Sequence, residues 1–192
     1  MTATLFALAL VVIRNFVKKL RLSYADIGWK LPGRRDLKQT SLFWVLGTSS
    51  CIVWAFLYFR AFERLLPAQY GRLTASKTTG YIQFLSEWGR EGGLCGTTAL
   101  WGSMLLLAAI EELTFRGIVL TSLKKEYSLK EALFWSTALF TLAHLNPYSF
   151  PVTFGLWFIF AMLYIKSGGL AAPISVHFAY NLSLVYLGKY IY

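Results

Sequence analysis

Apolar runs of membrane-spanning length are the feature that most restricts how this chain can fold. A helix crosses the hydrocarbon core of a bilayer with about 20 mainly apolar residues. The run Ser41–Phe62 has this length, and its single charged residue, Arg60, lies near its end. Further apolar runs recur through residues 94–187. The pattern predicts an all-α fold, a polytopic transmembrane helical bundle of about five or six spans.

Composition excludes several other classes of protein. Hydrophobic residues make up 56% of the chain and charged residues 15%, whereas soluble domains carry about 25% charge. A soluble enzyme, a disordered tail and a disulfide-stapled secreted module are therefore excluded. Cys51 and Cys95 are the two cysteines, and their wide separation makes neither a CxxC pair nor a disulfide framework.

The net charge of +10 is concentrated beside a hydrophobic segment. Residues 14–38 contain two acidic residues and eight basic ones, which are Arg14, Lys18, Lys19, Arg21, Lys30, Arg34, Arg35 and Lys38. This arrangement is typical of a cytoplasmic juxtamembrane loop attracted to anionic lipid headgroups. The lipid bilayer is the expected partner of these charges, and no nucleic acid is needed to explain them.

The first half of the chain is expected to contain one full-length span, Ser41–Phe62, and several shorter segments. Met1–Ile13 is shorter than a span and lacks a cleavage site, so it resembles a short first helix more than a signal peptide. Residues 63–93 are a mixed loop in which Tyr81–Trp88 could form an amphipathic helix in the interface. We therefore divide the chain into an N-terminal region, 1–93, with membrane helices, basic loop and linker, and a helical core, 94–192.

The second half is expected to contain four apolar helices separated by turn residues. They cover residues 94–123, 132–145, 151–165 and 170–187. The first would run about 45 Å as a straight helix, so it must tilt, kink or protrude. If residues 14–40 are cytoplasmic, the link 146–150 lies outside, and one helix more or fewer between residues 62 and 94 would reverse this orientation.

Few ionisable residues remain within the apolar segments. They are Glu111, Glu112, Arg116, His144 and His177, with Asn181 as a polar companion. A charged group at the bilayer centre costs about 2.5–3.5 kcal/mol on insertion scales, so such groups normally face a protein interior or a water-filled cavity. We expect an intramembrane polar cavity lined by this set.

Spacing along the helices predicts how the carboxylates divide. Glu112 and Arg116 are four residues apart and can form an ion pair along one helix. Glu111 points about 100° away and stays available. A purely structural interpretation also fits each group, because an intramembrane Glu–Arg pair can clamp two helices and a histidine can donate an interhelical hydrogen bond.

Several intramembrane hydrolase chemistries are excluded by missing motifs. The sequence contains no HExxH zinc motif. It also contains no GxSG serine element and no aspartate within a hydrophobic segment. The remaining chemistry is that of glutamate and histidine.

Three short motifs resemble one protein family. Glu111–Arg116, Phe140–His144 and His177–Asn181 look like the EExxxR, FxxxH and HxxxN motifs of the CPBP family, the CAAX protease and bacteriocin-processing family, also called Abi. The motifs occur in order on successive hydrophobic helices and cover about half of the chain. Upstream, Tyr24–Trp29 is similar to a short glycine-containing segment that often precedes the core in such proteins.

The resemblance implies an intramembrane endopeptidase with a water-accessible cavity. It would cleave a peptide or a membrane-anchored protein, as in CAAX-type processing. By resemblance, Glu111 would activate water and His144 would help to orient it. His177 and Asn181 would polarise the scissile carbonyl and stabilise the oxyanion.

The resemblance also implies supporting residues and raises the question of a metal. Glu112 and Arg116 would lock their helix, and Phe140 would help to orient the site. Family members are described as metalloproteases, and Glu111, His144 and His177 could supply ligands to Zn²⁺. The histidines are 33 positions apart on separate helices, so we favour a glutamate-activated water without an obligatory metal.

Two other functions remain open at this stage. A non-catalytic protein of bacteriocin immunity could act by binding, and a proton-coupled transporter could use the same Glu and His groups as a relay. No inverted repeat relates residues 1–93 to 94–192, which argues against the transporter. In each case we expect an integral, multi-pass protein of a bacterial cell membrane.

Overall fold

The described part of the chain consists of helices joined by turns and contains no strand. The computed structural model describes residues 11, 14–15, 17–23, 25–29, 34–74, 84–85, 87–89 and 91–191. Its helices are α2 (Arg34–Leu65), α3 (Pro67–Thr74), α5 (Gly93–Glu112), η1 (Leu113–Leu120), α6 (Thr121–Glu126), α7 (Leu129–Ala143), α8 (Phe150–Ser167) and α9 (Ala171–Ile191). This confirms the predicted all-α class. The helix expected over Met1–Ile13 lies outside the described residues except at residue 11. Of the amphipathic helix expected over Tyr81–Trp88, residues 84, 85, 87 and 88 are described, and all four are helical.

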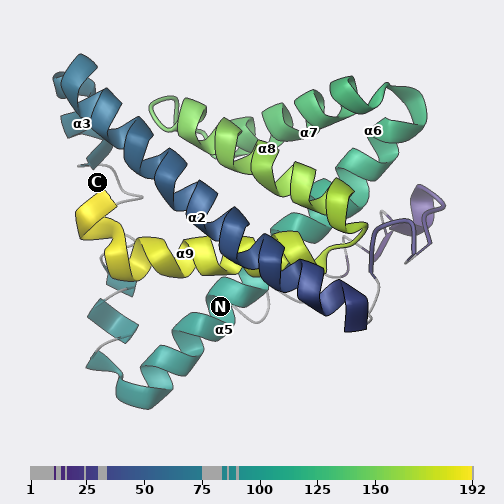
Figure 1. Ribbon diagram of the computed structural model, residues 1–192, viewed down its shortest axis with the longest axis horizontal. Coiled ribbons are helices and arrows are strands. Elements are labelled where there is room, and N and C mark those ends of the chain that lie inside the picture. The colour runs from purple at the N-terminus through teal and green to yellow at the C-terminus, as the bar shows by residue number, and fades with distance from the viewer. Residues whose placement is uncertain are drawn as a thin grey trace.

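The helices pack as a bundle around α8 and α9. α2 runs across both of them, α7 lies beside α8, and α5 contacts α9 (Figure 1). Within the described residues, three helices are long and apolar enough to cross a membrane, over Trp44–Leu65, Gly93–Glu126 and Phe150–Ser167. We expected five or six spans. α7 accounts for part of the difference, because its 15 residues are fewer than the roughly 20 that a span needs.

α2 begins earlier than hydropathy predicted. The predicted span started at Ser41, whereas the helix starts at Arg34 and continues to Leu65. Residues 34–40 are mostly good helix formers, so the helix continues past the apolar run. The basic loop expected over residues 14–40 is therefore helical over its last seven positions. Hydropathy located the apolar part of the helix, but it did not locate the helix end.

Turn chemistry sets the ends of the last three helices. Ser128 and Glu131 form a capping box at the start of α7, and this motif satisfies two unpaired N–H groups. α8 begins at Phe150 with Pro151 in its first turn, and it ends at Ser167, followed by the C-cap residue Gly168, where φ is 68°. α7 ends at Ala143 rather than Leu145. These boundaries lie close to the predicted ones.

The long apolar segment 94–123 changes its helical form rather than running straight. α5 passes directly into η1, a π-helix of 8 residues, and then into α6. A π-helical stretch widens the turn and shifts the register of the residues that follow it, and such stretches often occur at functional sites. The predicted irregularity is thus a π-helical segment, and it contains Arg116.

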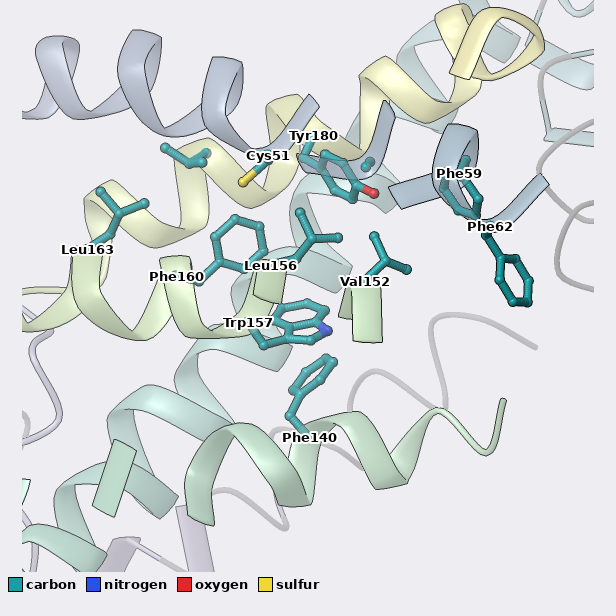
Figure 2. Packing of buried hydrophobic residues seen from close by; sticks show 12 residues of the cluster. Cys51, Phe59, Phe62, Phe140, Val152, Leu156, Trp157, Phe160, Leu163 and Tyr180 are labelled. Carbon is teal, nitrogen blue, oxygen red and sulfur yellow. The ribbon is translucent and has the colours of Figure 1, made fainter. Parts of the chain in front are cut away.

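One hydrophobic cluster joins the helices around the polar residues. It includes Cys51 and Phe59 of α2, Phe140 of α7 and Trp157 of α8. Figure 2 shows Trp157 against Phe140, between α8 and α7, with the two ring planes tilted by 35°. By contrast, large apolar side chains on other faces are about half exposed, such as Leu106 at 43%. Such exposed faces suit contact with lipid.

A turn over residues 25–28, which we call the 25–28 turn, fastens the N-terminal part to the core. The Ser23 hydroxyl and backbone N–H both donate to Asp26 Oδ2 at 2.7 Å. Gly28 has φ +73°, and its carbonyl accepts the Leu170 N–H at 3.1 Å. A Cβ on Gly117, in η1, would lie 3.2 Å from the Ile27 carbonyl oxygen. The turn therefore lies against both the π-helical segment and the start of α9.

Candidate active site

Glu112, Arg116 and His177 form a buried polar network. Arg116 Nε lies 3.2 Å from Glu112 Oε2, and His177 Nδ1 lies 2.9 Å from Glu112 Oε1. The exposed fractions of the three residues are 0%, 1% and 2%. The ion pair predicted from the four-residue spacing is confirmed. The bond to His177, which joins two helices, was not predicted.

Arg116 is held on all sides. Its Nη2 donates to the Trp157 carbonyl at 2.8 Å. The guanidinium carbon lies 4.8 Å from the Trp157 ring centroid and 5.5 Å from that of Phe140. Burying a cation is costly unless it is paired and hydrogen-bonded, and aromatic faces add cation–π attraction. These contacts explain how a charged residue can lie inside a hydrophobic bundle.

The ring of His177 is fixed by both hydrogen bonding and stacking. It stacks on Phe160 with ring centroids 5.0 Å apart, and it meets Trp157 edge to face at 4.7 Å. Because the Glu112 carboxylate is an acceptor, the Nδ1 of His177 is the donor in their hydrogen bond. The other ring nitrogen, Nε2, is thereby directed toward Glu111.

Glu111 faces a different environment from its neighbour. Its Oε2 lies 3.6 Å from His177 Nε2, and its side chain is 23% exposed, compared with 0% for Glu112. The predicted division of the two carboxylates is therefore observed. Glu112 is enclosed by ionic partners, whereas Glu111 combines one imidazole neighbour with partial exposure.

The charges of this cluster balance when Glu111 and His177 share one proton. Glu112 and Arg116 cancel each other. A single proton, on either Glu111 Oε2 or His177 Nε2, makes the combined charge of Glu111 and His177 zero. Buried charge is tolerated only when it is compensated. The arrangement can therefore shift a proton between a carboxylate and an imidazole without changing the net charge of the site.

His144 and Phe140 lie beside the buried network. His144 is the C-cap residue of α7, and its Nδ1 lies 3.1 Å from the Phe140 carbonyl oxygen. The His144 ring centroid is 4.5 Å from that of Phe140 and 5.7 Å from that of Trp157. Phe140 is 1% exposed and lies beneath both Arg116 and His144. The side chain of His144 is exposed.

Asn181 lies one helical turn after His177 on α9 and is half-buried. This is the relative position that the sequence predicted for it. Its predicted role beside His177 stays a prediction.

The residues proposed as zinc ligands do not gather into a metal-binding cluster. Among the described residues, no group of three or more His, Cys, Asp or Glu side chains is placed to hold a metal ion. The Nδ1 of His177 is already bonded to Glu112. The donor set in this part of the chain therefore does not fit a three-ligand zinc site.

Comparison with known families identifies the helical core. Residues 94–183 match the family described as type II CAAX prenyl endopeptidase Rce1-like. Over these residues, which are somewhat under half of the chain, the sequence is similar to the CAAX protease family. This confirms the resemblance drawn from the three motifs, all of which lie within the matched residues. No curated protein and no solved structure matches the chain.

The match to the CAAX protease family indicates a general chemistry for the site. The family is one of peptidases, so the enzyme class is hydrolase and the expected substrate is a peptide or protein. Together with three helices of membrane-spanning character, it makes the chain an integral membrane protein. The matched segment begins at residue 94, so it does not include the 25–28 turn.

Trp157 and Phe160 are the residues of this CAAX protease site that sequence reasoning missed. Both lie on α8 in a run of apolar residues, where aromatic side chains are usually part of the core. The signal that could have revealed them is weak. Trp157 and Phe160 are three residues apart, so they share one face of α8.

Proposed function

We propose that this chain is an intramembrane endopeptidase that hydrolyses a peptide bond of a membrane-associated protein or peptide, using a water activated by Glu111. One observation carries the proposal. Glu111 lies partly exposed against His177 Nε2 at 3.6 Å, while the adjacent Glu112 is fully enclosed. A partly accessible carboxylate beside a directed imidazole is an arrangement suited to general acid–base catalysis.

In this mechanism Glu111 acts as the base. With the shared proton on His177, the Glu111 carboxylate is ionised and can accept a proton from a water molecule as that water attacks the scissile carbonyl. The same proton can then pass to the leaving amine, so that Glu111 acts next as the acid. His144, at the exposed end of α7, is proposed to orient the attacking water.

His177 supplies the electrophilic side of the reaction. When Nε2 carries the proton, it can donate to the developing oxyanion, and Asn181 is proposed as a second donor from the next turn of α9. A preorganised donor of this kind typically contributes about 10²–10³ in kcat. Glu112 is a positioning residue, because its hydrogen bond to Nδ1 at 2.9 Å fixes the ring orientation, and Arg116 holds Glu112.

A role for Zn²⁺ is kept as a question for experiment. When bound, such an ion would polarise the carbonyl and lower the pKa of a bound water. Because the described donor set does not fit a three-ligand site, we derive no step from a metal. The substrate class that we propose is a CAAX-type C-terminal segment presented at the membrane of a bacterial cell, with the basic N-terminal segment on the cytoplasmic side.

Cleavage of a peptide library by the purified protein in lipid nanodiscs tests the proposal. The variants are Glu111→Gln and a matched control, Glu126→Gln, which changes an exposed glutamate at the end of α6. We expect cleavage by wild type and the control and a loss of at least about 100-fold in Glu111→Gln. Unchanged cleavage by Glu111→Gln would reject Glu111 as the base.

A chelator arm in the same assay tests the metal. We expect cleavage to persist after treatment with a strong chelator. Complete loss in chelator with recovery on adding Zn²⁺ alone would establish a metal-dependent mechanism instead.

A further inference from the structure

Trp157 contains a buried hydrogen-bond donor with no partner. The residue is 5% exposed, and its indole Nε1–H makes no hydrogen bond within the part of the chain that the structure describes. Buried polar groups are nearly always paired, because an unpaired donor forfeits its bond to water and gains nothing in return. An unpaired indole N–H therefore needs an explanation.

Other indoles in the bundle find partners. Trp54 Nε1 donates to the Val152 carbonyl at 3.1 Å, and Trp101 Nε1 donates to the Tyr186 hydroxyl at 3.0 Å. Both of these tryptophans are more exposed than Trp157, at 40% and 46%. The most buried of the three donors is thus the unpaired one, although a phenylalanine could fill much of the same space without burying a polar atom.

The position of Trp157 connects this donor with the site. Its ring centroid lies 4.7 Å from that of His177 and 5.7 Å from that of His144. Arg116 covers its face and binds its backbone carbonyl. The indole therefore lies beside both histidines, with the buried arginine over its ring.

The direction of the N–H also points to the site. Figure 2 shows the indole nitrogen on the side of the ring toward the Val152 end of α8, away from the Leu163 end. α7 and α8 are joined by the short link 144–149 and pack side by side, so that end of α8 lies beside the end of α7. α7 ends at His144. The indole nitrogen therefore lies on the side of the ring nearer the link between α7 and α8, where His144 is found.

We propose that Trp157 Nε1–H donates a hydrogen bond to the carbonyl oxygen of the scissile peptide group of the substrate. This inference rests on the proposed function. An indole N–H can only donate, so its partner must be an acceptor, and a peptide carbonyl is the acceptor that a protease substrate brings. The bond strengthens as negative charge develops on that oxygen, and the donor then acts beside His177.

Replacing Trp157 with an isostere that lacks only the N–H tests the proposal. Benzothienylalanine, introduced at position 157 by codon suppression, has sulfur in place of the indole nitrogen and nearly the same shape. We expect kcat to fall about 100-fold while KM stays within about twofold, because the lost bond is made mainly in the transition state. Introducing 7-azatryptophan, which keeps the N–H, should retain activity.

The matched control is benzothienylalanine at position 101. It removes the hydrogen bond from Trp101 to Tyr186 at a site on α5 away from the histidines, and it should leave kcat unchanged. All three variants should unfold at the wild-type temperature, which separates a catalytic effect from a packing effect. If a variant with the isostere at 157 is misfolded, Trp157→Phe is assayed in its place with the same expectation.

Each outcome bears on one proposal. A wild-type kcat with the isostere at position 157 would overturn the role of Trp157 and leave the endopeptidase intact. A higher KM with unchanged kcat would also overturn it, since the N–H would then bind the ground state. Absence of cleavage by well-folded wild type would overturn the endopeptidase itself, and the role of Trp157 with it.

Discussion

Glu111 and Glu112 are neighbours in the sequence, yet the structure treats them in opposite ways. Glu112 is fully buried and contacts both Arg116 and His177, whereas Glu111 is 23% exposed and faces His177 alone among the ion pairs of the described residues. A rotation of about 100° between consecutive helical residues is sufficient to separate them. The comparison teaches that an intramembrane site needs one carboxylate to hold its geometry and another to remain available.

Two features enforce this division. η1 begins directly after Glu112, so the π-helical register determines where Arg116 lies relative to Glu112. Arg116 also binds the Trp157 carbonyl of α8, while Glu112 binds His177 of α9. Glu112 is therefore part of a connection between three helices. Glu111 can change its protonation without breaking that connection.

Removing the arginine should have the largest effect on stability and activity. Arg116→Met leaves the charge of Glu112 buried without its partner, and breaking a buried pair in this way costs about 3–5 kcal/mol of stability. We expect a large fall in the unfolding temperature and complete loss of cleavage. Thermal unfolding in nanodiscs measures the first effect. A wild-type unfolding temperature would show that Glu112 does not depend on Arg116.

Removing both charges should be less damaging than removing one. The double variant Glu112→Gln, Arg116→Met replaces the ion pair with neutral groups, so no uncompensated charge is left. We expect it to unfold at a higher temperature than Arg116→Met. A double-mutant cycle with the two single variants gives the coupling energy of the pair. Additive effects would contradict the view that Arg116 holds Glu112.

Changing the available carboxylate should affect activity only. Glu111→Gln keeps the size and shape of the side chain, and we expect its unfolding temperature to stay close to wild type while cleavage falls by at least about 100-fold. The comparison would fail if Glu111→Gln destabilised the fold as strongly as Arg116→Met does.

Substitution in the 25–28 turn should destabilise the part of the fold that contains Glu112 and Arg116, although the turn is not part of their polar network. Gly28 has φ +73°, and a Cβ there would lie 2.7 Å from Tyr164 Cε2. We expect Gly28→Ala to destabilise the protein by about 1–3 kcal/mol, through backbone strain and overpacking. Gly71, which has open space around it, provides the control as Gly71→Ala. Equal unfolding temperatures for the two variants would contradict a fastening role for the turn.

The smallest effect is expected for the capping box of Ser128 and Glu131, which lies away from both Glu111 and Glu112. The pKa of the exposed Glu131 carboxyl lies below the usual 4.5. The larger cause is the hydrogen bond from the Ser128 hydroxyl, and the smaller one is the bond from the Ser128 backbone N–H. The stability that this capping box provides is present above pH 4.5 and is lost as the pH falls through the lower folded pKa. Ser128→Ala should lower the unfolding temperature slightly at pH 7 and should remove this part of the acid dependence. A wild-type acid dependence in Ser128→Ala would assign it to other groups.

Local sequence signals predicted much of the fold and half of the network. Helix boundaries followed from capping and turn residues such as Gly168 and Pro151, because those residues act on their immediate neighbours. The Glu112–Arg116 pair followed from helical spacing for the same reason. The start of α2 was missed, because hydropathy shows which residues are apolar enough to lie in the bilayer. It does not show where the helical backbone begins or ends.

Contacts between distant segments were beyond sequence reasoning. The bond from His177 to Glu112 joins residues 65 positions apart, and no spacing rule specifies it. The same holds for Trp157, whose apolar surroundings on α8 gave no hint that its N–H would be unpaired. The π-helical form of η1 was also hidden, because it depends on how the segment packs and not on a distinctive residue.

The contacts of the 25–28 turn have a consequence for how the protein is made. Tyr164 donates to the Asp26 carbonyl across 138 positions of the chain, and Gly28 receives the Leu170 N–H. The ribosome therefore synthesises the turn long before Tyr164 and Leu170. The turn cannot make these contacts until the later helices have been synthesised and inserted. His177 follows Leu170 by seven residues. The polar network that includes His177 can therefore be assembled only after α9 has been synthesised.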